Sequence, residues 1–406
     1  MDFASIAGGV CAPRGFKANG VHCGIRANRS KADLALIVSD VPASAAAIYT
    51  QNLVKGAPLS VTKQHILDGK AQAVVCNSGN ANTCNANGIE IAEGMAALVE
   101  QATGIAASDV IVASTGVIGE PLSLAPIETG MPVLVAGLSA EGANAAAQAI
   151  MTTDTVRKEA AAEFFLGGKA CRLGGMAKGS GMIHPNMATM LCFVTSDVAI
   201  APGVLQAVLQ KSADATLNMI TVDGDTSTND MCCVLANGLA GNEEIRGPGA
   251  DCDAFAAALT QVMQALAKLL AGDGEGATKR LECHVAGAKD LAGARAAAKG
   301  VVGSSLFKAA MFGADANWGR VLCALGYCGA ELDITKVAVD FVSAAGRVSV
   351  CKNGAGVPFS EAQAKQVLRE RAVRIEIALG DGTAEATAWG CDLTYDYVKI
   401  NGDYRT

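Results

Sequence analysis

Aromatic and charged residues are both scarce in this 406-residue chain, at 4% and 17% of the sequence. The formal net charge is −7 and no basic stripe is present to neutralise phosphates, so we expect no nucleic-acid partner. The sequence also contains no uninterrupted apolar run of about 18 residues, the length that a membrane-spanning helix needs, and we therefore expect no membrane association.

Histidine is rare, with only four in the chain, and no two lie at metal-ligand spacing. This disfavours a zinc enzyme or one built on a histidine triad, so a catalytic base would have to be another group. The 14 cysteines are scattered without a CxxC pair, which is typical of small buried residues in a reducing compartment. The N-terminal segment lacks the pattern of a signal peptide. We expect a cytoplasmic protein without a disulfide framework.

Glycine and alanine, by contrast, are abundant, and the length favours two lobes. Short apolar runs that end in polar residues or glycine predict strands, and an apolar stripe at helical spacing predicts a helix over 252–271 that Gly272 ends. Alternating segments later in the chain predict further strands and hairpins, with a turn at 380–382. Because some strands follow one another directly while others alternate with helices, we predict an α/β fold, a mixed-sheet α/β sandwich with two lobes.

One stretch raises a question of chemistry. Residues 178–193 read KGSGMIHPNMATMLCF, in which a glycine-rich loop meets an apolar run at Thr189. Thr189 could be an ordinary strand residue, because threonine favours strands. It could instead be a nucleophile, since a threonine at a chain N-terminus can use its own α-amine as the base. The second interpretation requires cleavage of the peptide bond after Ala188, and the spacing leaves both open.

Several polar clusters interrupt the apolar background. The segment ASTGVIG at 113–119 could supply backbone N–H groups for an oxyanion or could be a plain turn. MTTDT at 151–155 could be a helix N-cap. GDGEGATK at 272–279 places Glu275 between glycines, and amide- and hydroxyl-rich stretches occupy 77–88 and 221–230. Each could be a surface loop, but together they favour an active site lined with small polar groups.

At these residues the chain resembles the ornithine acetyltransferase family, the glutamate N-acetyltransferases of arginine biosynthesis (ArgJ type). The resemblance covers essentially the whole chain. The motifs that carry it, in order, are NSGNAN, STGVIG, MTTDT, AKGSGMIHPNMATMLCF, TVDGDTSTND, DGEGATK, GADANWGR and INGDYRT.

The resemblance implies a self-cleaving enzyme with the logic of N-terminal-nucleophile hydrolases. The precursor would be cut between Ala188 and Thr189 into chains 1–188 and 189–406, which stay together as an α2β2 heterotetramer. Thr189 would then be the nucleophile, and Thr115 and Gly116 the oxyanion hole. The substrate-binding positions that the resemblance implies are Thr152, Lys178, Thr189, Glu275, Asn401 and Thr406.

The implied reaction is a ping-pong transfer of an acetyl group from N-acetylornithine to glutamate, with no metal and no bound cofactor. Acetyl-CoA is expected as a second donor, although a monofunctional enzyme is the alternative. The chain departs from the family pattern at Asn85, Ala86 and Arg157, which bears on fine specificity. Lys178 could bind a substrate carboxylate or tune the Thr189 amine. A self-cleaving aminopeptidase or amidase would pass the acyl group to water, and a non-catalytic binding protein would remain one uncut chain.

Overall fold

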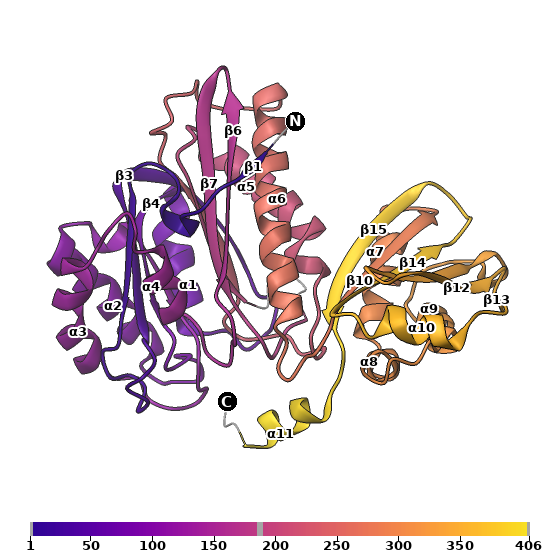
Figure 1. Cartoon of the computed structure of the whole chain (residues 1–406). Helices are drawn as coiled ribbons and strands as arrows, with labels where there is room; N and C mark the ends of the chain where they lie inside the picture. The colour runs from indigo at the N-terminus through magenta and orange to yellow at the C-terminus, as the bar shows by residue number, and fades with distance from the viewer. Residues whose placement is uncertain (1–2, 185–189, 404–406) are drawn as a thin grey trace.

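Two mixed β-sheets organise residues 3–184 and 190–403, the part of the chain that the computed structural model describes (Figure 1). The larger sheet has the order β1-β6-β7-β8-β9-β3-β4-β5, with β2 paired to β3. Its strands are β1 Ala4–Ser5, β2 Phe16–Val21, β3 Leu34–Tyr49, β4 Lys70–Asn77, β5 Val110–Ser114, β6 Lys158–Leu166, β7 Lys169–Lys178, β8 Leu191–Ser196 and β9 Met231–Ala236. The smaller sheet has the order β13-β12-β11-β14-β10-β15. Its strands are β10 Arg280–Ala288, β11 Ala338–Ser343, β12 Gly346–Lys352, β13 Ala355–Gly356, β14 Ala372–Ala378 and β15 Ala384–Cys391.

Helices cover both sheets. The α-helices are α1 Ala57–His65, α2 Gly88–Thr103, α3 Ala125–Ala136, α4 Ala143–Ala149, α5 Pro202–Ala215, α6 Ala250–Gly272, α7 Leu291–Gly303, α8 Ser305–Phe312, α9 Trp318–Gly326, α10 Glu361–Leu368 and α11 Tyr395–Asp403. Short 3-10 turns are η1 Gly9–Cys11, η2 Ile66–Asp68, η3 Ala107–Asp109, η4 Leu217–Met219 and η5 Ile334–Lys336.

The long strand β3 connects two halves of the larger sheet. Its first part pairs with β4 and its last part pairs with β9, with a register shift between Val38 and Ala43. Alternate residues face opposite sides, as strand geometry requires. Leu36 therefore packs with α2 and α3, whereas Ile37 joins an apolar cluster with Phe193 of β8. The two halves thus face each other across an apolar layer, with α2 and α3 outside one half and α5 and α6 outside the other. This arrangement confirms the predicted mixed-sheet α/β sandwich.

The helix α6 packs its apolar face into the core of the first lobe. It spans the predicted 252–271 and buries Phe255, Leu259 and Leu266 in the core cluster that includes β6 and β7 residues. It is long and apolar enough to cross a membrane by length and composition, but here its apolar face lies in the core. Gly272 is its last helical residue and Asp273 is the C-cap, so the predicted helix end is off by one residue.

The second lobe corrects one sequence prediction. β11 and β12 form a hairpin, with Ser343 opposite Gly346. The turn at 380–382 does join β14 to β15, but these two strands are not partners. β10 lies between them, parallel to β14 and antiparallel to β15. A hairpin at this turn was therefore wrong, because a strand from earlier in the chain takes the central position.

The structural lobes do not coincide with the predicted chains 1–188 and 189–406. β8, β9, α5 and α6 follow position 189 in sequence yet belong to the first lobe. The change from the first lobe to the second lies between Asp273 and Lys279, just before β10. The predicted division concerns covalent connectivity and stays a prediction.

Candidate active site

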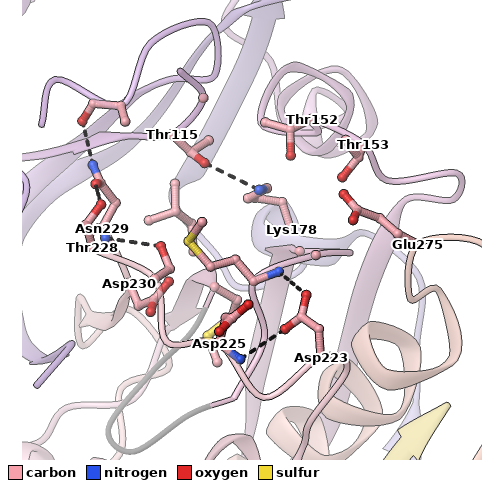
Figure 2. Close-up of a pocket in the computed structure, with 18 of the residues that line it drawn as sticks. Thr115, Thr152, Thr153, Lys178, Asp223, Asp225, Thr228, Asn229, Asp230 and Glu275 are labelled. Carbon is pink, nitrogen blue, oxygen red and sulfur yellow. Dashed lines mark hydrogen bonds between the residues drawn. The ribbon is translucent and has the colours of Figure 1, made fainter. Parts of the chain in front are cut away.

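A cavity of about 240 Å³ opens where loops of the first lobe meet α11. Figure 2 shows side chains from the loops that line it. Its wall comes from the loops after β4, β5, α4, β7 and α6, from the start of β8, from the loop before β9, and from α11. The predicted site residues in its lining are Thr115, Gly116, Thr152, Lys178, Glu275 and Asn401. The predicted residues Ala188, Thr189 and Thr406 lie outside the described residues. The six predicted residues in the lining therefore come from five separate segments of the sequence.

The side chains of Thr115 and Lys178 contact each other in the wall of this cavity. Lys178 Nζ donates to Thr115 Oγ1 at 3.3 Å, as Figure 2 shows. The Thr115 backbone N–H donates to the Asn77 carbonyl oxygen at 2.9 Å. The hydroxyl accepts from Lys178, so its own hydrogen is free to donate. The donor that Thr115 can offer to a bound molecule is therefore its hydroxyl group.

Gly116 occupies a conformation that suits only glycine. Its φ is +128°, and a Cβ at this position would lie 2.7 Å from the Gly79 carbonyl carbon. The loop after β4 thus approaches the Gly116 backbone more closely than any side chain allows. The chain does turn away from the sheet after β5, as the sequence predicted. The turn places the Gly116 backbone and the Thr115 hydroxyl group next to each other in the cavity wall.

Lys178 ends β7 and is only 8% exposed. Burial lowers its pKa, and the charge of Asp154 opposes this shift in part. No carboxylate of the described chain forms an ion pair with it, unlike Lys158 below. A buried ammonium without a paired carboxylate at a cavity wall is suited to binding the carboxylate of a small molecule.

A buried ion cluster lies behind the cavity. Lys158 is fully buried, and its Nζ lies 2.6 Å from Asp154 Oδ1 and 2.6 Å from Asp273 Oδ2. Asp154 also accepts from the backbone N–H groups of Thr152, at 2.9 Å, and Gly179, at 2.7 Å. The cluster therefore fixes the MTTDT segment to the chain directly after Lys178. MTTDT is a loop between α4 and β6, and the alternative that it caps a helix was wrong.

The same cluster holds the loop that carries Glu275. Asp273 accepts from the backbone N–H and the hydroxyl of Thr155. Its carbonyl oxygen accepts from Ser180 Oγ at 2.6 Å, and Glu275 N–H donates to the Ser180 carbonyl at 3.0 Å. The segments that carry Thr152, Lys178 and Glu275 are thus connected through the cluster around Lys158.

α11 closes one side of the cavity. Asn401 Nδ2 donates to Glu275 Oε2 at 2.7 Å, and the Tyr397 hydroxyl donates to Asp223 Oδ2 at 3.3 Å. The start of the helix rests on Gly276, where a Cβ would lie 2.7 Å from Tyr397 N. The structure therefore brings Asn401 to Glu275, as the sequence analysis expected of residues at one site.

Sequence reasoning missed several residues of the cavity. Within TVDGDTSTND it named a polar loop but no residue, and the cavity lining includes Asp223, Asp225, Thr228, Asn229 and Asp230. Repeated small polar residues immediately before a buried strand were the available signal. Conversely, the departures at Asn85, Ala86 and Arg157 are not in the described lining.

The ArgJ family matches residues 17–406. The arginine biosynthesis bifunctional protein ArgJ of Symbiobacterium thermophilum is 54% identical over 403 residues, covering 99% of each chain. The protein of the same name from Caldanaerobacter subterraneus subsp. tengcongensis is 50% identical, over 97% of this chain and 98% of its own. A crystal structure of arginine biosynthesis bifunctional protein ArgJ from Bacillus halodurans is 46% identical with a TM-score of 0.50. It covers 52% of this chain and 98% of its own.

Proposed function

The chain belongs to the ArgJ family, and on this premise we propose that it transfers an acetyl group from N-acetylornithine to glutamate. It is an acetyltransferase of arginine biosynthesis. The observation that carries the proposal is the gathering of six predicted site residues, from distant parts of the sequence, around one small polar cavity. A cavity of this size suits an amino acid and its acetylated form.

The acetyl group passes through an ester on Thr189. Thr189 attacks the acetyl carbonyl, its free α-amine takes the hydroxyl proton, and the amine of ornithine leaves. Glutamate then enters and its amine takes the acetyl group. The negative oxygen that forms in each step is stabilised by the Thr115 hydroxyl and the Gly116 backbone N–H. The conformation of the Thr115–Gly116 turn supports this role.

Opposite charges hold the substrate at its two ends. Lys178 binds a substrate carboxylate, which its burial and its lack of a carboxylate partner in the described chain support. Glu275 binds a substrate ammonium group, with Asn401 holding the carboxylate in place. Thr152 and Thr406 complete the substrate contacts. Lys178 also lies close enough to Thr115 to stabilise the developing oxyanion.

Self-cleavage between Ala188 and Thr189 generates the nucleophile. Lys178 and Leu191 are opposite each other in the β7–β8 ladder, so the cut falls between two paired strands in the sequence. The ladder can hold both fragments together after the cut. The length of the solved relative also supports cleavage, since nearly all of that chain matches only about half of this one.

The enzyme is bifunctional, which the names of its relatives support, and its second acetyl donor is acetyl-CoA. It needs no bound cofactor, because acyl transfer uses only the nucleophile, its amine and the oxyanion donors. We further propose that two copies of each fragment assemble as an α2β2 heterotetramer in the cytoplasm, with small molecules as the other partners.

The test is a product assay on the purified protein. With N-acetylornithine and glutamate we expect N-acetylglutamate and ornithine in equal amounts. With acetyl-CoA and glutamate alone we expect N-acetylglutamate if the enzyme is bifunctional. Release of free acetate at the rate of donor consumption would instead identify an amidase and overturn the proposal.

A further inference from the structure

Asp230 has a buried carboxyl oxygen that lacks a partner. The residue lines the cavity and is 3% exposed, and its Oδ2 makes no hydrogen bond within the described chain. Figure 2 places it beside Thr228 and Asn229, away from Glu275 in that view. Leaving a buried polar atom unpaired is unfavourable, so such an atom in an active-site wall indicates a partner that arrives with the substrate.

Hydrogen bonds of the larger sheet hold Asp230 close to the start of β8, the strand that follows the predicted nucleophile in sequence. Asp230 is the residue before β9, and its carbonyl oxygen accepts from Thr50 N–H at 3.0 Å. Met231 N–H donates to the Met190 carbonyl at 3.0 Å, and Leu191 pairs with Met231 where β8 and β9 run parallel. Asp230 therefore stands at the amino-terminal end of β8, where the chain enters the sheet from the predicted cleavage site.

The other carboxyl groups of the cavity are already engaged or exposed. Asp223 accepts from the backbone N–H groups of Met182 and Ile183 and from a tyrosine hydroxyl. Glu275 accepts from an asparagine amide, and Asp225 is exposed. Among the described carboxyl groups of the lining, only Asp230 has an oxygen that is fully buried and makes no hydrogen bond.

The environment of Asp230 favours the protonated form of its carboxyl group. Burial raises the pKa of this carboxyl well above its usual range, and a hydrogen bond from Ser227 and the charge of Lys178 oppose the shift only in part. The raised pKa favours the protonated carboxyl group, which can donate a proton. After donating, the carboxylate it leaves is stabilised by the nearby Lys178 charge.

We propose that Asp230 is a further catalytic residue, whose carboxyl group gives a proton to the amine that leaves the acetyl donor and recovers one from the amine of the acceptor. The inference rests on the proposed function. An amide nitrogen is a poor leaving group until it is protonated, so amide donors need an acid at this step. A buried acid beside the cavity supplies it without water.

The protons balance over the two half-reactions. In the first, the bond from Thr189 oxygen to the acetyl carbon forms and the carbon–nitrogen bond breaks. The hydroxyl proton goes to the α-amine, and the Asp230 proton goes to the leaving nitrogen. In the second, a new carbon–nitrogen bond forms and the ester bond breaks. Asp230 takes the proton of the attacking nitrogen, and the α-ammonium returns its proton to the hydroxyl. The additional ammonium protons of donor and acceptor exchange with solvent and cancel.

The experiment compares two acetyl donors that differ in their need for an acid. N-acetylornithine loses an amine, which must be protonated, whereas 4-nitrophenyl acetate loses a phenolate that is stable without a proton. Acetylation of the Thr189 fragment is followed in a single turnover by mass spectrometry. For Asp230→Asn we expect acetylation from N-acetylornithine to slow by about 10²–10⁴, the usual worth of acid catalysis. Acetylation from 4-nitrophenyl acetate should stay near the wild-type rate.

The control variant is Asp253→Asn, which removes an exposed carboxyl group of α6 far from the cavity and should change neither rate. Equal slowing with both donors would mean that Asp230 only shapes the site, and it would overturn the proposal. Normal rates with both donors would overturn it as well. A wild-type protein that is acetylated by neither donor would instead contradict the proposed function.

A second measurement needs no variant, in case Asp230→Asn does not fold or cleave. In the wild-type enzyme, acetylation from N-acetylornithine should fall as the pH rises through the ionisation of Asp230, and acetylation from 4-nitrophenyl acetate should not. The other ionisable groups of the site are the α-amine, Lys178, Asp223, Asp225, Glu275 and Tyr397. Lys178 and Glu275 bind the charged ends of N-acetylornithine only, so both profiles are taken at saturating donor, where ionisation that weakens binding does not limit the rate. The α-amine acts on both donors alike, and the remaining difference between the two profiles isolates the acid. Parallel profiles would overturn the proposal.

Discussion

Lys158 and Asp273 lie 115 positions apart in the sequence, yet Lys158 Nζ is 2.6 Å from Asp273 Oδ2 in the interior of the first lobe. Asp154 occupies the other side of the same ammonium group. One lysine between two carboxylates leaves a negative charge, which backbone N–H groups and the nearby Lys178 offset. Asp154 lies two residues from Thr152, and Asp273 lies two residues from Glu275. The same ion pairs that stabilise the fold therefore also position these two predicted substrate residues.

Replacement of Lys158 by methionine should be strongly destabilising. It leaves two buried carboxylates without a cation, and breaking a buried pair by removing one partner typically costs about 3–5 kcal/mol. We expect a clear fall in the thermal unfolding midpoint. Lys169→Met, at an exposed position of β7, is the matched control and should change the midpoint little. Equal midpoints for the two variants would contradict a stabilising role for the cluster.

Asp154 should make the protein sensitive to acid. Burial by itself raises the pKa of this carboxyl, but the charges of Lys158 and Lys178 and two hydrogen bonds hold it well below its usual range. A group with a depressed pKa in the folded state stabilises at pH values above its unfolded pKa, about 3.9, and loses this contribution as the pH falls further. The unfolding midpoint should therefore drop below about pH 4 in the wild type. Asp154→Asn should be less stable at neutral pH and show a shallower drop.

Cleavage should divide the protein into residues 1–188 and 189–406. On a denaturing gel we expect two fragments, with threonine as the first residue of the second. Thr189→Ala removes the hydroxyl that attacks the Ala188 carbonyl, so it should leave one uncut chain without transferase activity. Thr189→Ser keeps a hydroxyl and should still be cut, at least in part. Any other residue at the start of the second fragment would contradict the assigned site.

Thr115→Ala should slow acetyl transfer without weakening substrate binding. The Thr115 N–H is already occupied by Asn77, so removal of the hydroxyl takes away the donor that Thr115 offers to the oxyanion. Loss of one such donor typically lowers kcat by about 10²–10³. Thr115→Ser keeps the hydroxyl and should retain most of the activity. An effect on KM alone would reassign Thr115 to substrate binding.

The positions of helices and strands could be predicted from the sequence better than the pairing of the strands. The apolar stripe of α6 and the runs that became β3, β4 and β5 were predictable, because periodicity reports which face of an element is buried. The insertion of β10 between β14 and β15 was not, since strand order depends on contacts between distant segments. Lys158 looks like any strand lysine until its carboxylate partners are known. Asp223, Asp225 and Asp230 are likewise the same residue type in one loop, and only the pairing of β9 with β3 and β8 buries the third.

The final prediction concerns the end of the chain. Chain ends are usually disordered and tolerate change, so an unimportant terminus is the default expectation. Here α11 instead reaches the cavity, where Asn401 Nδ2 donates to Glu275 Oε2 at 2.7 Å. Deletion of residues 401–406 should therefore greatly reduce acetyl transfer, because Glu275 loses the amide that positions it and the predicted contacts of Thr406 are lost.

The same deletion should leave cleavage intact, because cleavage needs the loop after β7, Thr189 and the oxyanion donors but not the tail. Asn401→Ala should reproduce part of the loss, with KM for the amino-acid substrates raised more than kcat is lowered. Lys399→Ala, an exposed change on the same helix, is the control and should behave as wild type. A truncated enzyme with full activity would remove Asn401 and Thr406 from the site. An uncut truncated chain would show that α11 is required before the nucleophile exists.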